Sequence, residues 1–212
     1  MNLHDLIATI MQNYPDDQTE RLDDPYKGNT TAELLRDGLQ NVSCTKSLLS
    51  NYVVKGSAGQ GRWSILPWIG IFDKDLSDSP QKSYYLAYLF SDEMDNAYLS
   101  LNQGWTFFKD HYTQPLETAE QVNDYWRHHL TINNSRITTA DINLVKEKRD
   151  RDARLGNEIC NIASIHYVKN NLPDNQQMIT DLQIMINLFQ ELKQKLHSTN
   201  LETSINDIIN NQ

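Results

Sequence analysis

The sequence predicts an α+β domain with a small curved, mostly antiparallel central sheet, flanked by N- and C-terminal helices. Two observations favour this fold class. Short apolar and aromatic runs, separated by turn-forming residues, lie in the middle of the chain. Apolar residues recur at helical spacing near both ends, most clearly over residues 175–196.

The totals indicate a soluble globular protein. The 212 residues fit a single domain over 1–212, with a core of about 3–196 and a polar tail over 197–212. No apolar run is long enough to cross a bilayer, and the N-terminus lacks a secretory signal. Cys44 and Cys160 form neither a zinc-binding pattern nor a disulfide framework. We therefore expect a cytoplasmic protein with no membrane contact.

The first third of the chain predicts two helices. Apolar residues at helical spacing indicate a helix over 3–13, which Tyr14-Pro15 is expected to end. Residues 15–29 are polar and turn-rich and predict a loop. A helix-start pattern followed by leucines predicts a second helix over 30–41.

The middle of the chain predicts the sheet. Residues 48–54 lead into a glycine-rich stretch as a strand, and 64–72 form the next strand. Residues 84–90 are rich in aromatic side chains and pair with 97–102 as an antiparallel hairpin. Residues 105–108 fit either a short strand or the start of a helix.

The last third alternates between helices and one strand. Residues 118–130 predict a helix, and 141–150 a short strand followed by a solvated, charged segment. Residues 159–168 predict a further strand. The segment 175–196 is the longest amphipathic helix, and 197–212 contains a weak helix at most.

The residue types needed for catalysis do not form a recognisable set. Glu191-Leu-Lys193 matches part of a nuclease pattern but lies on the amphipathic helix, where surface ion pairing is the expected role. His128 and His129 are adjacent and point different ways on a helix, which is poor geometry for one metal. No phosphate-binding loop ending in Lys-Ser/Thr is present. We expect no catalytic residues, no metal and no cofactor, and a protein that binds.

Charge is distributed unevenly along an acidic chain. The formal net charge is −9, which argues against a protein coated in positive charge for nucleic acid. Yet Gly38 to Phe72 contains no Asp or Glu, while Lys46, Lys55 and Arg62 are present. Such a segment can hold a polyanion on one local basic face; chance fluctuation of composition is the alternative.

Aromatic residues on two neighbouring strands suggest a pocket. Alternation places Tyr85, Ala87 and Leu89 on one face of their strand and the other aromatic residues on the opposite face. One face must pack on helices, so the other can display Tyr85 and Leu89 beside Trp68. Aromatic walls that grip a flat ring suit a flipped base. A tight turn between two core strands, with the tryptophans as packing, is the alternative.

A family resemblance rests on four stretches. The central one is Val54-Lys-Gly-Ser-Ala-Gly-Gln-Gly-Arg-Trp-Ser-Ile-Leu-Pro-Trp-Ile-Gly-Ile-Phe72, which resembles the central motif of the McrB-like N-terminal domain family. The others are Ser83-Tyr-Tyr-Leu-Ala-Tyr-Leu-Phe90, Ala97-Tyr-Leu-Ser-Leu-Asn-Gln-Gly104 and the segment from Gly156 to Leu172-Pro173 with the helix that follows it. The resemblance covers nearly the whole chain.

The resemblance implies a DNA-recognition domain of a modification-dependent restriction or anti-phage system. Such domains read methylated or otherwise modified cytosine, and the McrB branch flips the base into a pocket. The implied partners are double-stranded DNA with modified cytosine and a nuclease or GTPase motor module, in the same chain or a partner chain. A protein-interaction module that recruits or restrains a nuclease, without DNA contact, is the alternative; a small enzyme acting on nucleotides is a third.

The resemblance also implies site residues. The implied base pocket consists of Trp68, Tyr85, Leu89 and Gln60. The implied contacts to the DNA backbone and along the loop are Lys55, Ser57, Gly59, Gly61, Arg62 and Lys82. The three basic residues among them are candidates for phosphate contacts. Ordinary surface charge is the alternative for these three. The sequence departs from the McrB branch between the two loop glycines, where Gln60 replaces an aromatic residue. Glutamine can hydrogen-bond a base edge or fill a vacated position, but it stacks poorly.

Overall fold

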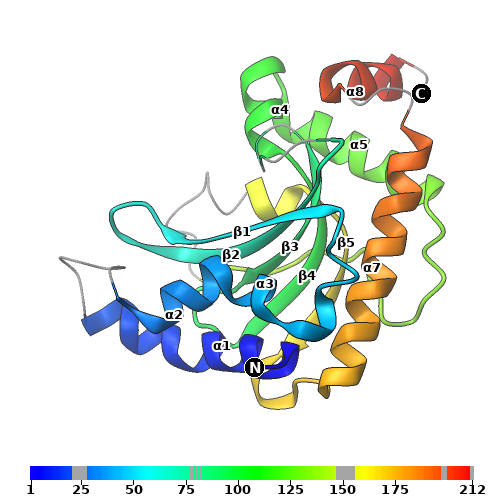
Figure 1. Ribbon diagram of the computed structural model, residues 1–212. Helices are drawn as coiled ribbons and strands as arrows, with labels where there is room; N and C mark the ends of the chain where they lie inside the picture. Colours follow the sequence, from blue (N-terminus) through cyan, green and yellow to red (C-terminus); the bar gives the residue numbers. More distant parts are fainter. Residues whose placement is uncertain are drawn as a thin grey trace.

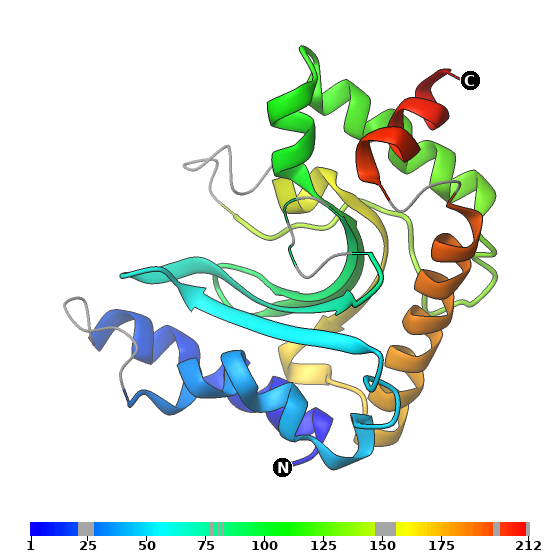
Figure 2. The same ribbon diagram turned by 45° about the horizontal axis from the view of Figure 1, so that its top comes forward.

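Five antiparallel strands form one open sheet in the order β1-β2-β3-β4-β5, so each strand pairs with its neighbour in the chain. This is a computed structural model, and it describes residues 1–20, 28–76, 79, 81, 83–146, 156–196 and 200–210. The strands are β1 (Tyr52–Gly59), β2 (Trp63–Asp73), β3 (Tyr84–Phe90), β4 (Asn96–Gln103) and β5 (Asn161–Val168). The sheet is bent into a trough, and the β1–β2 hairpin extends beyond the other strands (Figures 1 and 2).

Helices cover the convex side and one end of this trough (Figure 2). Those before the sheet are α1 (Leu3–Glu20), α2 (Thr30–Glu33), the π-helical turn η1 (Leu34–Gly38), α3 (Leu39–Asn41) and the 3₁₀ turn η2 (Ser43–Thr45). Those after β4 are α4 (Trp105–His111), α5 (Pro115–His129), the 3₁₀ turn η3 (Lys169–Asn171), α7 (Asn175–Lys195) and α8 (Leu201–Asn210). The arrangement confirms the expected α+β class.

The sheet buries side chains on both of its faces. The face toward the helices carries Tyr84, Leu86, Tyr88 and Phe90 of β3 into the main core. The other face carries Tyr85, Ala87 and Leu89 into a second, smaller cluster, which Ile142 and Leu144 of the segment after α5 complete. The predicted alternation along β3 is therefore confirmed.

The first helix is longer than the sequence predicts. α1 runs to Glu20 with Pro15 inside it, so the expected end at Tyr14-Pro15 is wrong, as is the first part of the loop expected over 15–29. Residues 21–27 of that expected loop lie outside the described residues. Proline removes one backbone donor and normally ends or bends a helix. Here the residues around it gain tertiary contacts: Tyr14 and Gln18 both hydrogen-bond backbone carbonyls of the β1–β2 hairpin.

The second predicted helix is confirmed over residues 30–41, with a wider turn in its middle. Asn29 caps it by accepting a hydrogen bond from the Ala32 backbone N–H at 2.9 Å. The π-helical turn η1 passes so close to β1 that a Cβ on Gly56 would lie 1.9 Å from the Leu35 carbonyl oxygen. Gly56 is thus required for close packing between two backbones rather than for a turn.

The remaining elements follow the predictions with local differences. Residues 105–108 begin helix α4. A short strand followed by a solvated segment is expected over 141–150, but residues 141–146 form no strand. Residues 147–150 lie outside the described residues. The strand expected over 159–168 starts at Asn161, because a helical turn occupies 156–159. α8 occupies most of the expected polar tail and buries its apolar face in the main core. The buried apolar residues of α8 are Leu201, Ile205 and Ile208.

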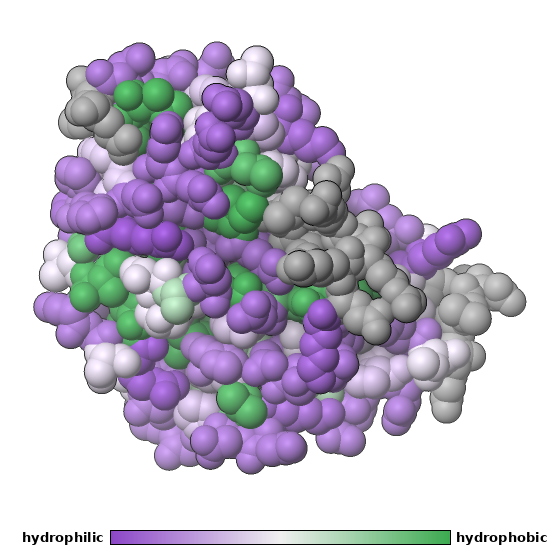
Figure 3. All heavy atoms as spheres, turned by 180° about the vertical axis from the view of Figure 1, so that it is seen from behind, coloured by the Kyte–Doolittle hydropathy of each residue, from purple (hydrophilic) through white to green (hydrophobic). Residues whose placement is uncertain are grey.

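Most of the surface seen from behind is hydrophilic, with apolar residues in small separate groups (Figure 3). Within the described residues, each helix is too short or too polar to span a bilayer.

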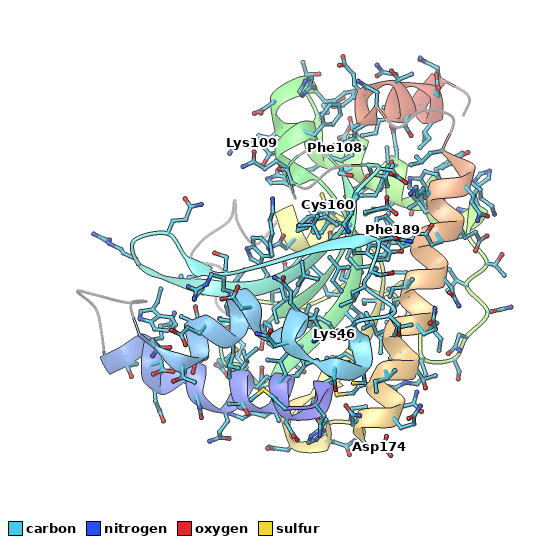
Figure 4. All side chains as sticks on the ribbon, viewed as in Figure 1. Lys46, Phe108, Lys109, Cys160, Asp174 and Phe189 are labelled. Carbon is cyan, nitrogen blue, oxygen red and sulfur yellow. The ribbon has the colours of Figure 1, made fainter. Side chains whose placement is uncertain are left out.

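Helix α7 is fixed at both ends. At its start Asp174 accepts a hydrogen bond from the Gln177 backbone N–H at 2.8 Å, and Phe189 further along points toward the sheet (Figure 4). Near its end the Lys193 ammonium lies 2.7 Å from a carboxylate oxygen of Asp73, the last residue of β2. The Asp73 side chain is only 3% exposed, so this ion pair joins the helix to the sheet across a largely dehydrated contact.

We expect stability to depend on pH through Asp73. Burial by itself would raise the pKa of Asp73, but hydrogen bonds from Lys193, the Asp75 backbone and Gln190 outweigh it and hold the pKa below 3.8. A lowered folded-state pKa means that the stabilisation is present above the unfolded value and is lost as the pH falls through the folded value.

Lys193→Met should therefore lower the free energy of unfolding at pH 7 by about 1.5–3 kcal/mol, the usual contribution of a hydrogen bond to a charged group. Urea unfolding from pH 7 to pH 2 measures this difference, with Lys46→Met at an exposed position after η2 as control. The difference from wild type should shrink below pH 3.8; a difference constant with pH would contradict this role of the ion pair.

Candidate functional site

The concave face of the sheet contains a cavity of about 220 Å³. Its sheet wall is formed by Trp68 of β2 together with Tyr85, Ala87 and Leu89 of β3. The volume lies below the roughly 300–1,000 Å³ of pockets for drug-sized ligands, which suits an occupant the size of a single ring system.

The strand register explains why this part of the face is hollow. Trp68 pairs with Leu89, and the next row on the same face pairs Gly70 with Ala87. Ala87 leaves space above the sheet and lines the cavity, whereas the rings of Phe72 and Trp68 fill the space above Gly70. A Cβ on Gly70 would lie 2.5 Å from the Phe72 ring, so no larger residue fits there without displacing that ring.

The rings of the cavity are positioned by a buried neighbour. Phe72 is fully buried; its ring centroid lies 6.4 Å from that of Trp68, at 85°, and 5.3 Å from that of Tyr85. Trp68 itself remains half-buried, so part of its ring faces the cavity. The two rings are thus held in place before any ligand arrives.

The rim of the cavity comes from other parts of the chain. Trp105 and Thr106 at the start of α4, Gly156 and Asn157 of the helical turn before β5, and Gln81 of the segment before β3 complete the lining. These residues were not predicted as part of the site. No local pattern connects them with Trp68, since only the folding of four separate segments brings them together.

The described lining is chemically neutral. All nine described lining residues are of uncharged types. Burial raises the pKa of Tyr85, so its hydroxyl stays protonated at physiological pH. Burial also raises the pKa of the nearby Cys160 thiol, which lies below α4 (Figure 4). The cavity can therefore stack on a flat ring and hydrogen-bond its edge without presenting an ionised group.

The tip of the β1–β2 hairpin is the second part of the site. Gln60, Gly61 and Arg62 are all exposed there. Gly59 and Gly61 have positive φ angles of 128° and 71°, which side chains rarely allow, so the tight tip depends on both glycines. The Ser57 hydroxyl accepts a hydrogen bond from the Gly59 N–H at 3.0 Å and stabilises the bend.

Helix α1 holds this hairpin in position. The Tyr14 hydroxyl lies 2.8 Å from the Ser64 carbonyl and 3.1 Å from the Ala58 carbonyl, and so bridges the two strands. Gln18 donates to the same Ser64 carbonyl at 3.1 Å. The Trp63 ring packs edge-on against Tyr14 with centroids 5.0 Å apart. The tip is therefore supported by the part of α1 that extends to and past Pro15.

The structure brings together some of the expected site residues. Trp68, Tyr85 and Leu89 line one cavity, and Ser57 pairs with Trp68 in the neighbouring strand. Lys55 pairs with Gly70 on the same face.

Other expected site residues lie apart from the cavity. Gln60, Gly59, Gly61 and Arg62 lie at or beside the hairpin tip, so Gln60 is not part of the cavity lining. Lys82 lies outside the described residues.

Residues considered for catalysis have structural partners. Glu191 accepts hydrogen bonds from Thr131 and pairs with Lys195 on the helix surface, as expected. Lys193 instead pairs with the buried Asp73 as well as with the exposed Asp75, so its role is not limited to surface pairing. Among the described residues, no three His, Cys, Asp or Glu side chains gather closely enough to hold a metal ion.

A scan of the sequence against protein-family models matches the MrcB-like, N-terminal domain over residues 9–194. The match spans α1 to the end of α7 and confirms the resemblance found in the sequence motifs. A search of curated proteins found no match.

We predict that Tyr14→Phe loosens the hairpin. The one hydroxyl hydrogen that the Ser64 and Ala58 carbonyls share is lost, so the free energy of unfolding should fall by about 0.5–1.5 kcal/mol. Hydrogen exchange of the amides in residues 57–64 should accelerate, while exchange in β4 changes less. Tyr125→Phe on α5 is the control, and equal changes in both variants would show that the bridge is unimportant.

Proposed function

Because the chain belongs to the MrcB-like N-terminal domain family, we propose that it reads modified cytosine in DNA for a restriction system. Family membership implies a DNA-binding role in restriction. In the proposed mechanism the modified base leaves the duplex and enters the cavity lined by Trp68, Tyr85 and Leu89.

The observation that carries the proposal is the pre-formed, ring-lined cavity on an exposed face. Stacking of a base on an aromatic side chain contributes about 1–3 kcal/mol. Extruding a base from the duplex costs a few kcal/mol, so stacking on Trp68 and contact with Leu89 offset much of that cost. The cavity volume of about 220 Å³ is compatible with one base.

Basic residues near the cavity are suited to the phosphates beside the extruded base. Lys55 lies on the cavity face of the sheet, and Arg62 lies at the hairpin tip. Lys109 is exposed on α4, at the other side of the trough (Figure 4). Lys46 follows η2, at the end of β1 far from the tip, and is not part of this group. Phosphate contacts orient the duplex without reading its sequence.

Gln60 has a separate role in this proposal. Its position at the exposed tip allows it to enter the place that the base leaves, while the cavity holds the base itself. Its amide can hydrogen-bond the unpaired partner base, but it does not stack as an aromatic residue would. Cleavage is assigned to a nuclease or GTPase motor module in the same or a partner chain.

We predict that the protein binds a duplex with 5-methylcytosine or 5-hydroxymethylcytosine more tightly than an otherwise identical plain duplex. Trp68→Ala should reduce that preference by about 5- to 150-fold, which corresponds to the 1–3 kcal/mol of one stacking contact. Fluorescence anisotropy at a fixed salt concentration measures the affinity for each duplex, with Tyr125→Ala as control. Equal affinity of the wild type for modified and plain duplexes would contradict the proposal, and no binding even at low salt would favour a protein-interaction role.

Lys55→Ala and Arg62→Ala should each lower the affinity for modified and for plain duplexes by the same factor. Each should also reduce the slope of log affinity against log salt by about 1, because one phosphate contact is lost. Lys74→Ala, at the end of β2 far from the hairpin tip, should leave the slope unchanged. A change in the modified-to-plain ratio in either variant would show that these residues contact the base rather than the backbone.

A further inference from the structure

The rim of the cavity differs in chemistry from its sheet wall. The sheet contributes the two rings Trp68 and Tyr85 with the aliphatic Leu89, whereas the rim contributes a third ring and two short hydrogen-bonding side chains. These are Trp105, Thr106 and Asn157. The inference below rests on the proposed function and concerns how the same site recognises its occupant.

The rim is held together by direct contacts. A Cβ on Gly156 would lie 2.5 Å from Cδ1 of Trp105, so the indole rests on the bare backbone at this glycine. The Cys160 N–H donates to the Gly156 carbonyl at 3.2 Å, and the Gln103 N–H donates to the Cys160 carbonyl at 3.1 Å. The turn that carries Asn157 is thereby attached to the end of β4, and its position is coupled to that of Trp105.

The start of α4 is attached in the same way. The Phe107 N–H donates to the Gln81 carbonyl at 3.2 Å, which fixes the first turn of α4 against the segment before β3. Thr106 lies between two positioned neighbours, Trp105 and Phe107, of which Phe107 is buried in the main core. The backbone that carries the rim side chains is therefore positioned by the surrounding contacts.

The polar groups of the rim are available to a ligand. Among the described residues, neither the Thr106 hydroxyl nor the Asn157 amide has a hydrogen-bond partner. Asparagine offers a donor and an acceptor side by side, and threonine offers either, which matches the donor and acceptor edge of an unpaired base. Both side chains are half-buried, so a hydrogen bond made there is shielded from water.

We propose that Trp105, Thr106 and Asn157 form a second wall that selects an uncharged modified base. Trp105 supplies a ring contact in addition to Trp68, and Thr106 and Asn157 hydrogen-bond the edge or the polar substituent of the base. A cytosine with a carboxylate at C5 is disfavoured, because an ionised group would lose its water among the neutral lining side chains, and Lys55, which lies outside that lining, is assigned to a phosphate.

The test measures the affinity of the whole chain for four otherwise identical duplexes. They carry cytosine, 5-methylcytosine, 5-hydroxymethylcytosine or 5-carboxylcytosine at one position. Thr106→Val and Asn157→Ala should each lower the ratio of 5-hydroxymethyl to plain affinity about 2- to 10-fold, the effect of one hydrogen bond. Trp105→Leu should lower it about 5- to 100-fold, and Trp105→Phe should retain most of it. The 5-carboxyl duplex should bind wild type at least about 10-fold more weakly than the 5-methyl duplex.

Matched substitutions at exposed positions outside the cavity, Thr113→Val and Asn170→Ala, should leave all ratios unchanged. Thermal unfolding of each variant shows whether it folds. Ratios that remain at the wild-type value in the rim variants, while Trp68→Ala abolishes the preference, would overturn the second wall and leave the proposed function intact. A wild type without any preference, unaffected by Trp68→Ala, would overturn both. Equal binding of the 5-carboxyl and 5-methyl duplexes would overturn the selection for an uncharged base.

Discussion

The alternation of side chains along β3 is the constraint on which the rest of the structure depends. Because successive residues of a strand point to opposite faces, Tyr84 and Tyr88 enter the main core while Tyr85 and Leu89 face the trough. A sheet with two buried faces needs cover on both. The segment after α5 supplies that cover over only part of the trough, and the small residue Ala87 leaves the uncovered part hollow. The cavity is thus a consequence of packing, and Phe72 fixes the rings around it.

The two functional parts of the face have separate supports. The hairpin tip is held by Tyr14 of α1, whereas the cavity rim is held by the contact between Trp105 and Gly156. Because these contacts already order both parts before binding, less conformational entropy is lost when a ligand binds. The arrangement separates contact with the duplex at the tip from recognition of the extruded base in the cavity.

The fold class and the sheet wall could be predicted from sequence, because both depend on local patterns. The aromatic run of β3 identifies its own alternation, and the motif around Trp68 identifies the family. The continuation of α1 past Pro15 could not be predicted, since it depends on hydrogen bonds to a hairpin 44–50 residues away. Trp105 was missed for the same reason: its place in the rim follows from contact with Gly156, 51 residues further along the chain. Gln60 was grouped with the pocket from its motif, but the extended hairpin places it at the tip.

The most direct measurement of the central claim is photochemical cross-linking from the base itself. A duplex with 5-iodocytosine at the target position forms, on irradiation, a covalent bond to an aromatic side chain that it contacts, and tandem mass spectrometry locates the adduct. Entry of the base into the cavity predicts adducts on Trp68, Tyr85 or Trp105. Adducts confined to the hairpin tip over residues 59–62, or to rings outside the cavity such as Tyr125, would contradict the account.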